Sequence, residues 1–378
     1  MSFKSFAINF VETNMGWRSK YYIKSLHHLC TTERIAIDTA VNEINNLECS
    51  NEEKEFLLED FKRTYYKRRM RFVEYYNMYR FFERDESSRE QFISYRDLEI
   101  IIRKYVDKNP NQRFVYSNKD VFLKTFSSYI KREWIVFDGT NCEEAEAFLQ
   151  NYDVIVKPTN DCSGHGVRKF EKGKATVEQL KTIYGNKFLA EECIENCEEL
   201  KRFHPSSLNT IRVITISDGN KVKTLCASLR TGNNNSVFDN ADSGGVFAEI
   251  DASSGIVVSD GVDKQGNVYE RHPYSNVIIK NTVIPRWSEI VEICESASLL
   301  MDTFISAWDI AVTDSGVEII EGNTSPSIEI NQSPLQQGIK RKLFEAFDDM
   351  HFDYRDCLRV LKLYERFHNE LKHFALRY

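Results

Sequence analysis

The chain has 378 residues, of which 42% are hydrophobic and 28% are charged, so it can bury a sizeable core and is expected to form about two or three domains or lobes. Its formal net charge of -7 argues against general nucleic-acid binding. No apolar run approaches the roughly 18 residues of a membrane span, and nothing near residue 1 resembles a signal peptide. The nine cysteines include no Cys-x-x-Cys pair, so reduced, packed thiols and a cytoplasmic location are expected.

Residues 1 to about 110 are expected to be mainly helical, because they contain few glycines and a single proline, Pro110. Ser50 and Glu53 form a capping-box pattern, and apolar residues follow at helical spacing. These apolar positions are Phe56, Leu57, Leu58, Phe61, Tyr65 and Tyr66. The basic run 67–71 could bind an anionic partner, but acidic residues are interleaved with it, which favours a solvated helix face.

From Val115 onward the pattern changes to alternating helices and strands. The expected elements are a helix over 119–130 capped by Ser117 or Asn118, a strand over 134–137, a helix over 143–150 and a strand over 153–156. The last strand ends in Lys157, and a charge that closes a buried strand needs a partner. The polar loop 160–167 follows, and its glycines allow backbone N–H groups to approach phosphate oxygens. A plain turn would also explain this loop.

A second region combines carboxylates with a hairpin that carries two arginines. The strand expected over 188–194 is followed by Glu198 and Glu199, which alone would be surface acids. Strands over 208–216 and 222–229 then flank a turn at residues 218–220. Even spacing would place both arginines on one face, which is unusual unless an anion binds there; edge arginines are the alternative. The residues on that face would be Arg212, Arg230, Ile214, Val222, Thr224 and Cys226.

The polar loop 239–245 leads into further strands, expected over 246–250 and 256–259. Pro285 opens a helix that is predicted to continue to about Ile305. After Pro334 the pattern is helical to the end of the chain.

The stretch 308–326 predicts a hairpin, because two apolar runs flank turn residues centred on Ser315. Asp309 would then lie opposite Glu321, and the two-residue period of a strand would put Asn323 on the same face. Opposed carboxylates repel unless a cation lies between them, and Mg²⁺ binds carboxylate and amide oxygens together with phosphate oxygens. An ordinary hairpin with an exposed polar end remains the alternative.

The order of these elements resembles that of the ATP-grasp superfamily: a strand ending in lysine, a glycine loop, a strand ending in glutamate, an arginine hairpin and an Asp…Glu-x-Asn hairpin. The stretches 207–212, 239–245, 308–311 and 321–323 resemble its sugar-transfer-associated branch, and the resemblance covers about residues 116–335. It implies an α+β fold, with two ATP-grasp lobes that contain antiparallel sheets, preceded by a mainly helical region. The implied divisions are a helical region over 1–115, a small lobe over 116–190, a large lobe over 191–345 and a helical tail over 346–378.

The resemblance also implies roles for individual residues. Those that match nucleotide-binding positions are Lys119, Lys157, Ser163, Gly164, His165, Gly166, Glu191, Ile194 and Glu198, and Lys124 competes with Lys119. Asp309, Glu321 and Asn323 match metal ligands, whereas Arg212 and Arg230 match positive groups beside the transferred phosphate. The candidates for holding the second substrate are Asp239, Asn240, Gly244 and Gly245.

The implied cofactors are ATP and Mg²⁺, and the implied enzyme is a carboxylate-amine ligase that forms a C–N bond through an acyl phosphate. The branch's association with surface-polysaccharide biosynthesis points to a sugar acid, amino sugar or amino acid, so the expected partners are a small carboxylate and an amine. Many relatives carry an α/β substrate-binding domain before the ATP-grasp lobes, whereas the region expected at the start of this chain is mainly helical. An ATP-dependent phosphotransferase and a non-catalytic nucleotide-binding scaffold remain alternatives.

Overall fold

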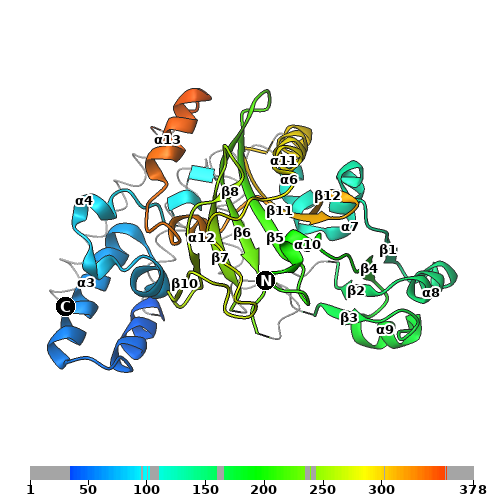
Figure 1. Cartoon of the computed structure of the whole chain (residues 1–378), viewed down its shortest axis with the longest axis horizontal. Helices are drawn as coiled ribbons and strands as arrows, with labels where there is room; N and C mark the ends of the chain where they lie inside the picture. Colours follow the sequence, from blue (N-terminus) through cyan, green and yellow to red (C-terminus); the bar gives the residue numbers. More distant parts are fainter. Residues whose placement is uncertain are drawn as a thin grey trace, which may run out of the picture.

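A computed structural model of the chain describes residues 35–94, 97–99, 101–102, 110–159, 166–234, 239, 244–301, 303–353 and 355. Figure 1 shows three parts side by side, with N-terminal helices and α13 at the left, a large sheet in the centre and a small sheet at the right. None of the described helices combines the length and the apolar composition that a membrane crossing requires.

The N-terminal helices are organised around α3 (Asn51–Arg68). The predicted capping box is present, because Ser50 and Glu53 exchange hydrogen bonds between side chain and backbone at the start of the helix. The elements that follow are η1 (Glu74–Met78), η2 (Phe81–Glu83) and α4 (Glu86–Arg89). Phe61 and Tyr75 belong to an aromatic core that also includes Phe247 and Ile330, so these helices pack against the large sheet and the segment after it.

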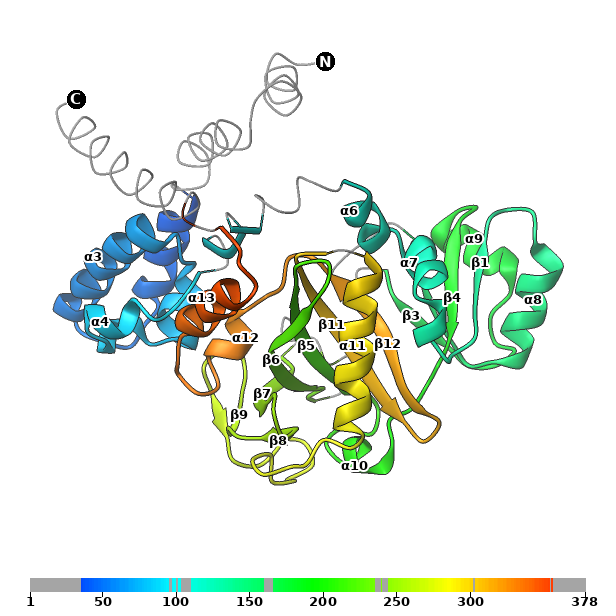
Figure 2. The ribbon, with the colours of Figure 1, turned by 90° about the horizontal axis from the view of Figure 1, so that it is seen from above.

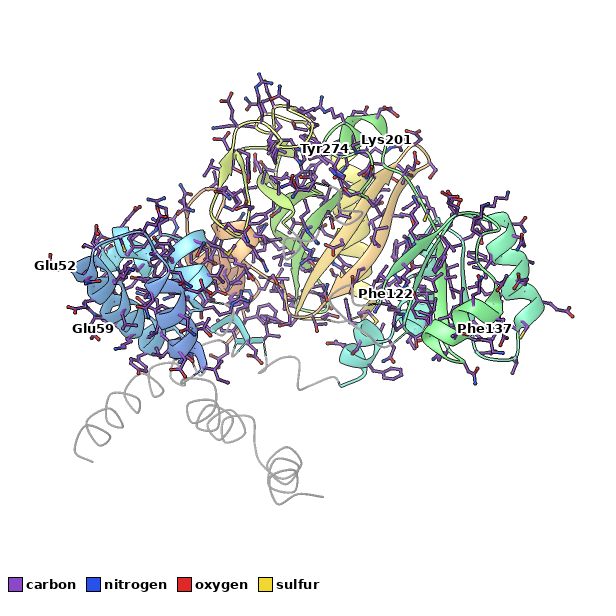
Figure 3. All side chains as sticks on the ribbon, turned by 90° about the horizontal axis from the view of Figure 1, so that it is seen from below. Glu52, Glu59, Phe122, Phe137, Lys201 and Tyr274 are labelled. Atoms are coloured by element: carbon purple, nitrogen blue, oxygen red, sulfur yellow. The ribbon has the colours of Figure 1, made fainter. Side chains whose placement is uncertain are left out.

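The small sheet has the strand order β1-β4-β2-β3, and all of its pairings are antiparallel. Its elements are β1 (Trp134–Phe137), α8 (Cys142–Asn151), β2 (Val154–Lys157), β3 (Arg168–Phe170), α9 (Val177–Tyr184) and β4 (Phe188–Glu192). A core that includes Leu149, Leu180 and Phe188 joins the sheet to α8 and α9, and Figure 3 labels Phe137 within it. The strands and the helix predicted in this region are confirmed to within one or two residues at nearly every boundary.

The large sheet has the order β10-β9-β7-β6-β5-β11-β12, with β8 paired to β7. Its strands are β5 (Thr210–Ser217), β6 (Val222–Thr231), β7 (Val246–Asp251), β8 (Ile256–Val257), β9 (Gly261–Val262), β10 (Val268–Tyr269), β11 (Ile305–Thr313) and β12 (Gly316–Asn323). Between the two sheets in sequence lies α10 (Glu198–Lys201). The adjacent pairings on the main path are antiparallel, as the sequence predicts for its two hairpins.

The two faces of the large sheet have different coverings. On one face, α11 (Trp287–Met301) contacts β5, β6, β11 and β12, and Trp308 lies fully buried in this layer with Phe126 and Val213. The short helices α6 (Pro110–Ser117), α7 (Lys119–Thr125) and η3 (Ser127–Tyr129) precede the small sheet, and Phe122 of α7 joins this core. Figure 2 shows α11 running along the strands of the large sheet.

The opposite face packs against α12 (Glu329–Gln332) and α13 (Lys340–Asp349), which lie between the sheet and the N-terminal helices in Figure 2. Leu343 and Phe347 of α13 pack on Ile214 and Cys226 at one end of this face. The remainder of the face carries polar residues, which form the candidate site described below.

Two predicted helix ends are wrong, and so is the predicted face of two residues of β6. The helix predicted to reach Ile305 ends at Met301, and Ile305 begins β11. The helix predicted over 119–130 ends at Thr125 and continues as a short 3-10 turn. Thr224 and Val222 lie on the α11 side of the sheet and not on the face of the arginines, because a bulge between Ile214 and Thr215 interrupts the alternation. The Thr224 hydroxyl donates to Glu295 there.

Candidate active site

The hairpin of β11 and β12 places two carboxylates opposite each other. Thr313 pairs with Gly316 across a two-residue turn, and Ile310 pairs with Ile319. A bulge then skips Ile320, so that Asp309 pairs with Glu321. The predicted opposition of Asp309 and Glu321 is confirmed, but a bulge produces it rather than a turn centred on Ser315.

Asn323 pairs with Ala307 and lies two residues beyond Glu321, so both side chains share one face of β12. Gly322 faces the other way. A Cβ atom at Gly322 would lie 2.8 Å from Tyr116 and 2.9 Å from Phe122, so the close packing of α6 and α7 on β12 requires glycine here. The Glu-Gly-Asn order therefore exposes two oxygen-bearing side chains on one face and permits tight packing on the other.

Asp309 lies at the centre of an arginine cluster. Arg212 binds both of its carboxylate oxygens, with Nη2 at 2.8 Å from Oδ2 and Nε on Oδ1, and Arg230 Nη1 donates to Oδ1 at 2.9 Å. Burial alone would raise the pKa of Asp309, but the two guanidinium groups outweigh it and hold this pKa below its ordinary value. Asp309 is therefore a buried carboxylate that stays ionised at neutral pH.

Asp239 belongs to the same cluster. It accepts hydrogen bonds from the Thr210 backbone and hydroxyl, and Arg230 Nη2 donates to it at 3.3 Å. Burial raises the pKa of Asp239, and neighbouring Asp309 raises it further. The structure thus brings a residue predicted for substrate binding together with the two arginines predicted to act at the transferred phosphate.

The residues present fit a Mg²⁺ ion held together with nucleotide phosphates. Asp309 and Glu321 are cross-strand neighbours with Cα atoms about 5 Å apart, and Asn323 adds an amide oxygen on the same face. Among the described residues there is no cluster of three or more His, Cys, Asp or Glu side chains that would hold a metal alone. Two carboxylates and one amide agree with the use of Mg²⁺ in sites where phosphate oxygens complete the shell.

A second charged network links the small sheet to the large sheet. Glu191 of β4 binds Lys157 of β2 through one oxygen and Arg132 through the other, with Arg132 Nη2 at 2.7 Å. Arg132 also donates to Glu318 of β12 at 2.8 Å. Arg132, Glu191 and Glu318 are all buried, so this chain of ion pairs connects the strand that carries Lys157 with the hairpin that carries Glu321.

This network predicts an acid-sensitive step in stability. Burial would raise the pKa of Glu191, but Lys157 and Arg132 outweigh it and lower the pKa to about 2 from 4.5. A depressed folded-state pKa stabilises the fold fully above pH 4.5, and this contribution is lost as the pH falls toward 2. It amounts to about 3 kcal/mol.

We expect Glu191→Gln to lower the free energy of unfolding at neutral pH and to flatten its decline below pH 4.5, as measured by urea titration at a series of pH values. An identical acid dependence in both proteins would show that Glu191 is not the titrating group.

Glu191 lies in the central strand of the small sheet, where it pairs with both Trp134 and Ile155. Its carboxylate forms ion pairs with Lys157 and Arg132, and its backbone pairs with both neighbouring strands. The adenine contact predicted for this segment would therefore come from residues beyond the strand. Ile194, which is half-buried, and Glu198, which is exposed at the start of α10, are placed there.

The predicted phosphate-binding segments lie at the open end of β2. The Lys119 backbone N–H donates to the Thr159 carbonyl at 3.2 Å, which ties the start of α7 to the base of the glycine loop, whereas Lys124 is exposed. Gly166 has a φ of +74°, and its carbonyl accepts a hydrogen bond from Tyr184 at 2.8 Å. Ser163, Gly164, His165 and Asn240 lie outside the described residues.

The remaining predicted substrate residues, Gly244 and Gly245, directly precede β7. Gly244 has a φ of +84°, and its carbonyl accepts from Asn233 at 3.3 Å. The glycine therefore allows a left-handed turn into the strand.

Several charged residues of this region were not predicted from sequence. Glu318 and Glu249 are single carboxylates inside apolar strands, in the stretches 317–320 and 246–250, and that pattern could have identified them. Arg132 gives no such signal, because it lies between Lys131 and Glu133 in a short charged run. Its importance depends on contacts with residues nearly two hundred positions away.

Several solved structures resemble the chain over part of its length at low sequence identity. The ATP-grasp ligase PsnB complexed with a minimal precursor is 14% identical, with a TM-score of 0.41 over 64% of this chain and 62% of that chain. D-alanine–D-alanine ligase from Bacillus anthracis is 17% identical, with a TM-score of 0.36 over 68% of this chain and 70% of that chain. VanG D-Ala:D-Ser ligase from Enterococcus faecalis is 13% identical, with a TM-score of 0.41 over 63% of both chains. The match thus spans less than two thirds of PsnB.

No curated protein matches the sequence at the threshold of significance. The family model described as sugar-transfer associated ATP-grasp matches residues 122–348, which is more than half of the chain. The predicted α+β fold class, with antiparallel sheets after a helical N-terminal region, is confirmed. The chain belongs to the sugar-transfer associated ATP-grasp family.

Proposed function

We propose that the protein is an ATP-dependent carboxylate-amine ligase that joins its substrates through an acyl phosphate. The observation that carries this proposal is the pairing of Glu321 with Asp309 and of Asp309 with Arg212 across neighbouring strands. It sets two carboxylates that can hold Mg²⁺ beside a guanidinium that can meet a phosphoryl group. We also propose the chain division predicted from sequence, with its boundaries after 190 and 345 moved to the ends of β4 and α13. The residue roles predicted from sequence are proposed too, except that Glu191 holds Lys157 and Arg132 and does not meet adenine.

In the proposed reaction, the substrate carboxylate takes the γ-phosphoryl group of ATP, and an amine then displaces phosphate from the acyl phosphate. When bound, Mg²⁺ would neutralise phosphate charge and hold the phosphates in place. Asp309, Glu321 and Asn323 would hold the ion, and Lys157 would offer a point charge to the nucleotide. Arg212 and Arg230 would reduce the repulsion between the two approaching anions.

Asp309 restrains both arginines in this arrangement. Because Arg212 and Arg230 share its carboxylate, their guanidinium groups are held in place before substrate arrives. Such preorganisation is what makes fixed charges effective in phosphoryl transfer. The glycine loop would exclude water, which would otherwise hydrolyse the acyl phosphate.

The proposed substrates are a sugar acid or amino acid carboxylate and an amino compound, in surface-polysaccharide biosynthesis. The family's association with sugar transfer supports a sugar-linked substrate. PsnB, the D-alanine–D-alanine ligase and the L-amino acid ligase of Bacillus licheniformis are all ligases, which supports the same reaction type. PsnB has been solved with Mg and ADP and the Bacillus anthracis ligase with ATP, which supports ATP and Mg²⁺ as cofactors here.

The test is to incubate the protein with ATP, Mg²⁺ and a panel of sugar acids and amino acids, each with a panel of amines. We expect mass spectrometry to show a joined product lighter than its two components by one water, together with ADP and phosphate. A parallel panel with hydroxylamine should trap the acyl phosphate as a hydroxamate. A phosphorylated hydroxyl compound would instead identify a phosphotransferase, and ATP binding with no turnover across the panel would favour a scaffold.

A further inference from the structure

A buried polar cluster lies under α12, on the same face of the large sheet as the candidate site. Ser228 of β6, Glu249 of β7 and Asn331 of α12 are 0%, 7% and 2% exposed. Asn331 Nδ2 donates to Ser228 Oγ at 2.5 Å and to Glu249 Oε2 at 3.3 Å. Asn331 Oδ1 is buried and has no hydrogen-bond partner among the described residues. A buried acceptor without a partner destabilises the fold, so it is unusual unless a ligand or a water donates to it.

The sheet register connects this cluster to the candidate site. Glu321 pairs with Asp309, Asp309 with Arg212, Arg212 with Ser228, and Ser228 with Glu249. Directly opposed residues of antiparallel strands point to the same face, so the five side chains form one row. Neighbouring strands are about 5 Å apart, so the backbone of Glu249 lies roughly 10 Å from that of Arg212. The row therefore runs from the proposed metal ligands to Glu249.

The hydrogen-bonding groups of the cluster indicate the class of ligand that it could bind. A carboxyl group, a hydroxyl oxygen and an unpartnered amide oxygen all accept hydrogen bonds. A primary ammonium group offers three donors and a positive charge that favours the ionised form of Glu249, whereas a carboxylate or phosphate has no donor for the Asn331 amide oxygen. The cluster thus complements a cationic amine.

We propose that Ser228, Glu249 and Asn331 bind the amino group of the second substrate, which would be a primary amine carried as an ammonium ion. This inference rests on the proposed ligase function and deepens it, because it names the class and the place of the attacking partner. In this arrangement the phosphate would bind at the Asp309 end of the row and the amine at the Glu249 end.

The proposed step balances as follows. The ammonium group gives one proton to the Glu249 carboxylate and becomes a neutral amine. Its nitrogen attacks the acyl carbon, so that a C–N bond forms and the C–O bond to phosphate breaks. The second proton leaves with the phosphate, and Glu249 later returns its proton to solvent.

The acidity of Glu249 suits this role. Burial raises its pKa to about 8, although the hydrogen bond from Asn331 acts in the opposite direction. A carboxyl group that titrates near neutral pH can accept a proton from a bound ammonium group, which an ordinary carboxylate does poorly.

Contacts with the N-terminal helices would hold α12 in position over this site. Arg71 binds Glu329 at 2.9 Å, and Gln332 Nε2 donates to Tyr79 at 2.9 Å. The Gln332 side-chain oxygen also accepts from the Ile93 backbone at 3.0 Å. Because Glu329 and Gln332 flank Asn331, these contacts hold Asn331 over Ser228 and Glu249. The helical region thereby acquires a role that its sequence did not suggest.

The test uses the full chain with ATP and Mg²⁺ and measures binding of paired probes by calorimetry. Each pair consists of an amine and the analogue that carries a hydroxyl in place of the amino group: D-glucosamine with D-glucose, and L-alanine with L-lactate. We expect at least one amine to bind on the order of tenfold more tightly than its analogue, and Glu249→Gln to remove that difference. Ser228→Ala should reduce it by a smaller factor, and Glu270→Gln, at an exposed residue, should not change it.

Two further measurements separate this site from the rest of the enzyme. ATP·Mg²⁺ affinity should stay within twofold in Glu249→Gln, because the proposed metal ligands lie at the other end of the row. If the wild type did not bind ATP·Mg²⁺, the ligase proposal itself would be contradicted. Glu249→Gln should match the wild type in stability below pH 4.5 and exceed it near pH 8, because the wild type loses stability as the pH rises through the raised pKa of Glu249, whereas the amide does not titrate. Amine preference that is absent from the wild type, or unchanged in Glu249→Gln, would overturn the proposed amine site.

Discussion

Replacing Asp309 with asparagine is expected to lower Mg²⁺-dependent ATP turnover by a factor on the order of a hundred to a thousand. The substitution removes one proposed metal ligand and also the charge that Arg212 and Arg230 share. The guanidinium groups would then be free to move, so metal binding and phosphate positioning would fail together. Turnover and ATP affinity measured over a Mg²⁺ titration would check this result.

Glu321→Gln separates the two causes. Glu321 is exposed, so its replacement should leave the melting temperature nearly unchanged while it raises the Mg²⁺ concentration needed for ATP binding. Glu52→Gln is a suitable control, because Glu52 is exposed on α3, far from the hairpin (Figure 3). If Asp309→Asn and Glu321→Gln both bound ATP·Mg²⁺ like the wild type, the metal assignment would be wrong.

The parts of the fold that were predictable from sequence are those determined by local chemistry. The capping box of α3, the strand Trp134–Phe137 and the two hairpins follow from caps, turns and strand periodicity. The junction of α11 and β11 does not, because the stretch 299–305 is largely apolar and its residues pack in either conformation. Tertiary contacts decide where such a segment changes from helix to strand.

The candidate site also combines residues that could be predicted from local sequence with features that depend on tertiary contacts. Asp309, Glu321, Arg212 and Arg230 could be proposed because short-range periodicity puts each pair on one face. The bulge at Ile320 could not be predicted, since Arg132, which donates to the Ile320 carbonyl, approaches from a distant part of the chain. Glu249 and Ser228 complete the row only once β7 is known to pair with β6 and β6 with β5.

Arg132 is the residue on which the two sheets depend most directly. Its Nη1 donates to the Ile319 carbonyl at 2.8 Å and its Nη2 to the Ile320 carbonyl at 3.3 Å, beside its ion pairs with Glu191 and Glu318. Ile320 is the residue that the β11–β12 pairing skips. Arg132 therefore supports the bulge that sets Asp309 opposite Glu321.

Arg132→Met is expected to lower the free energy of unfolding by about 3–5 kcal/mol, because it leaves two buried carboxylates without this counter-charge. Urea unfolding would measure the loss. Arg286→Met provides a matched control, since the Arg286–Glu289 pair lies at the surface with side chains 48% and 36% exposed. An exposed pair contributes only about 0–1 kcal/mol.

Adding Glu318→Gln to Arg132→Met should recover part of the loss, because one of the two carboxylates is then neutral. At a temperature where Arg132→Met is still folded, it should also need more Mg²⁺ to bind ATP, since Asp309 and Glu321 would no longer be held in register. Equal stability in Arg132→Met and Arg286→Met would show that the buried network does not support the fold. A destabilised variant with an unchanged Mg²⁺ requirement would show that the bulge persists without Arg132, and that the metal site is set by β11 and β12 alone.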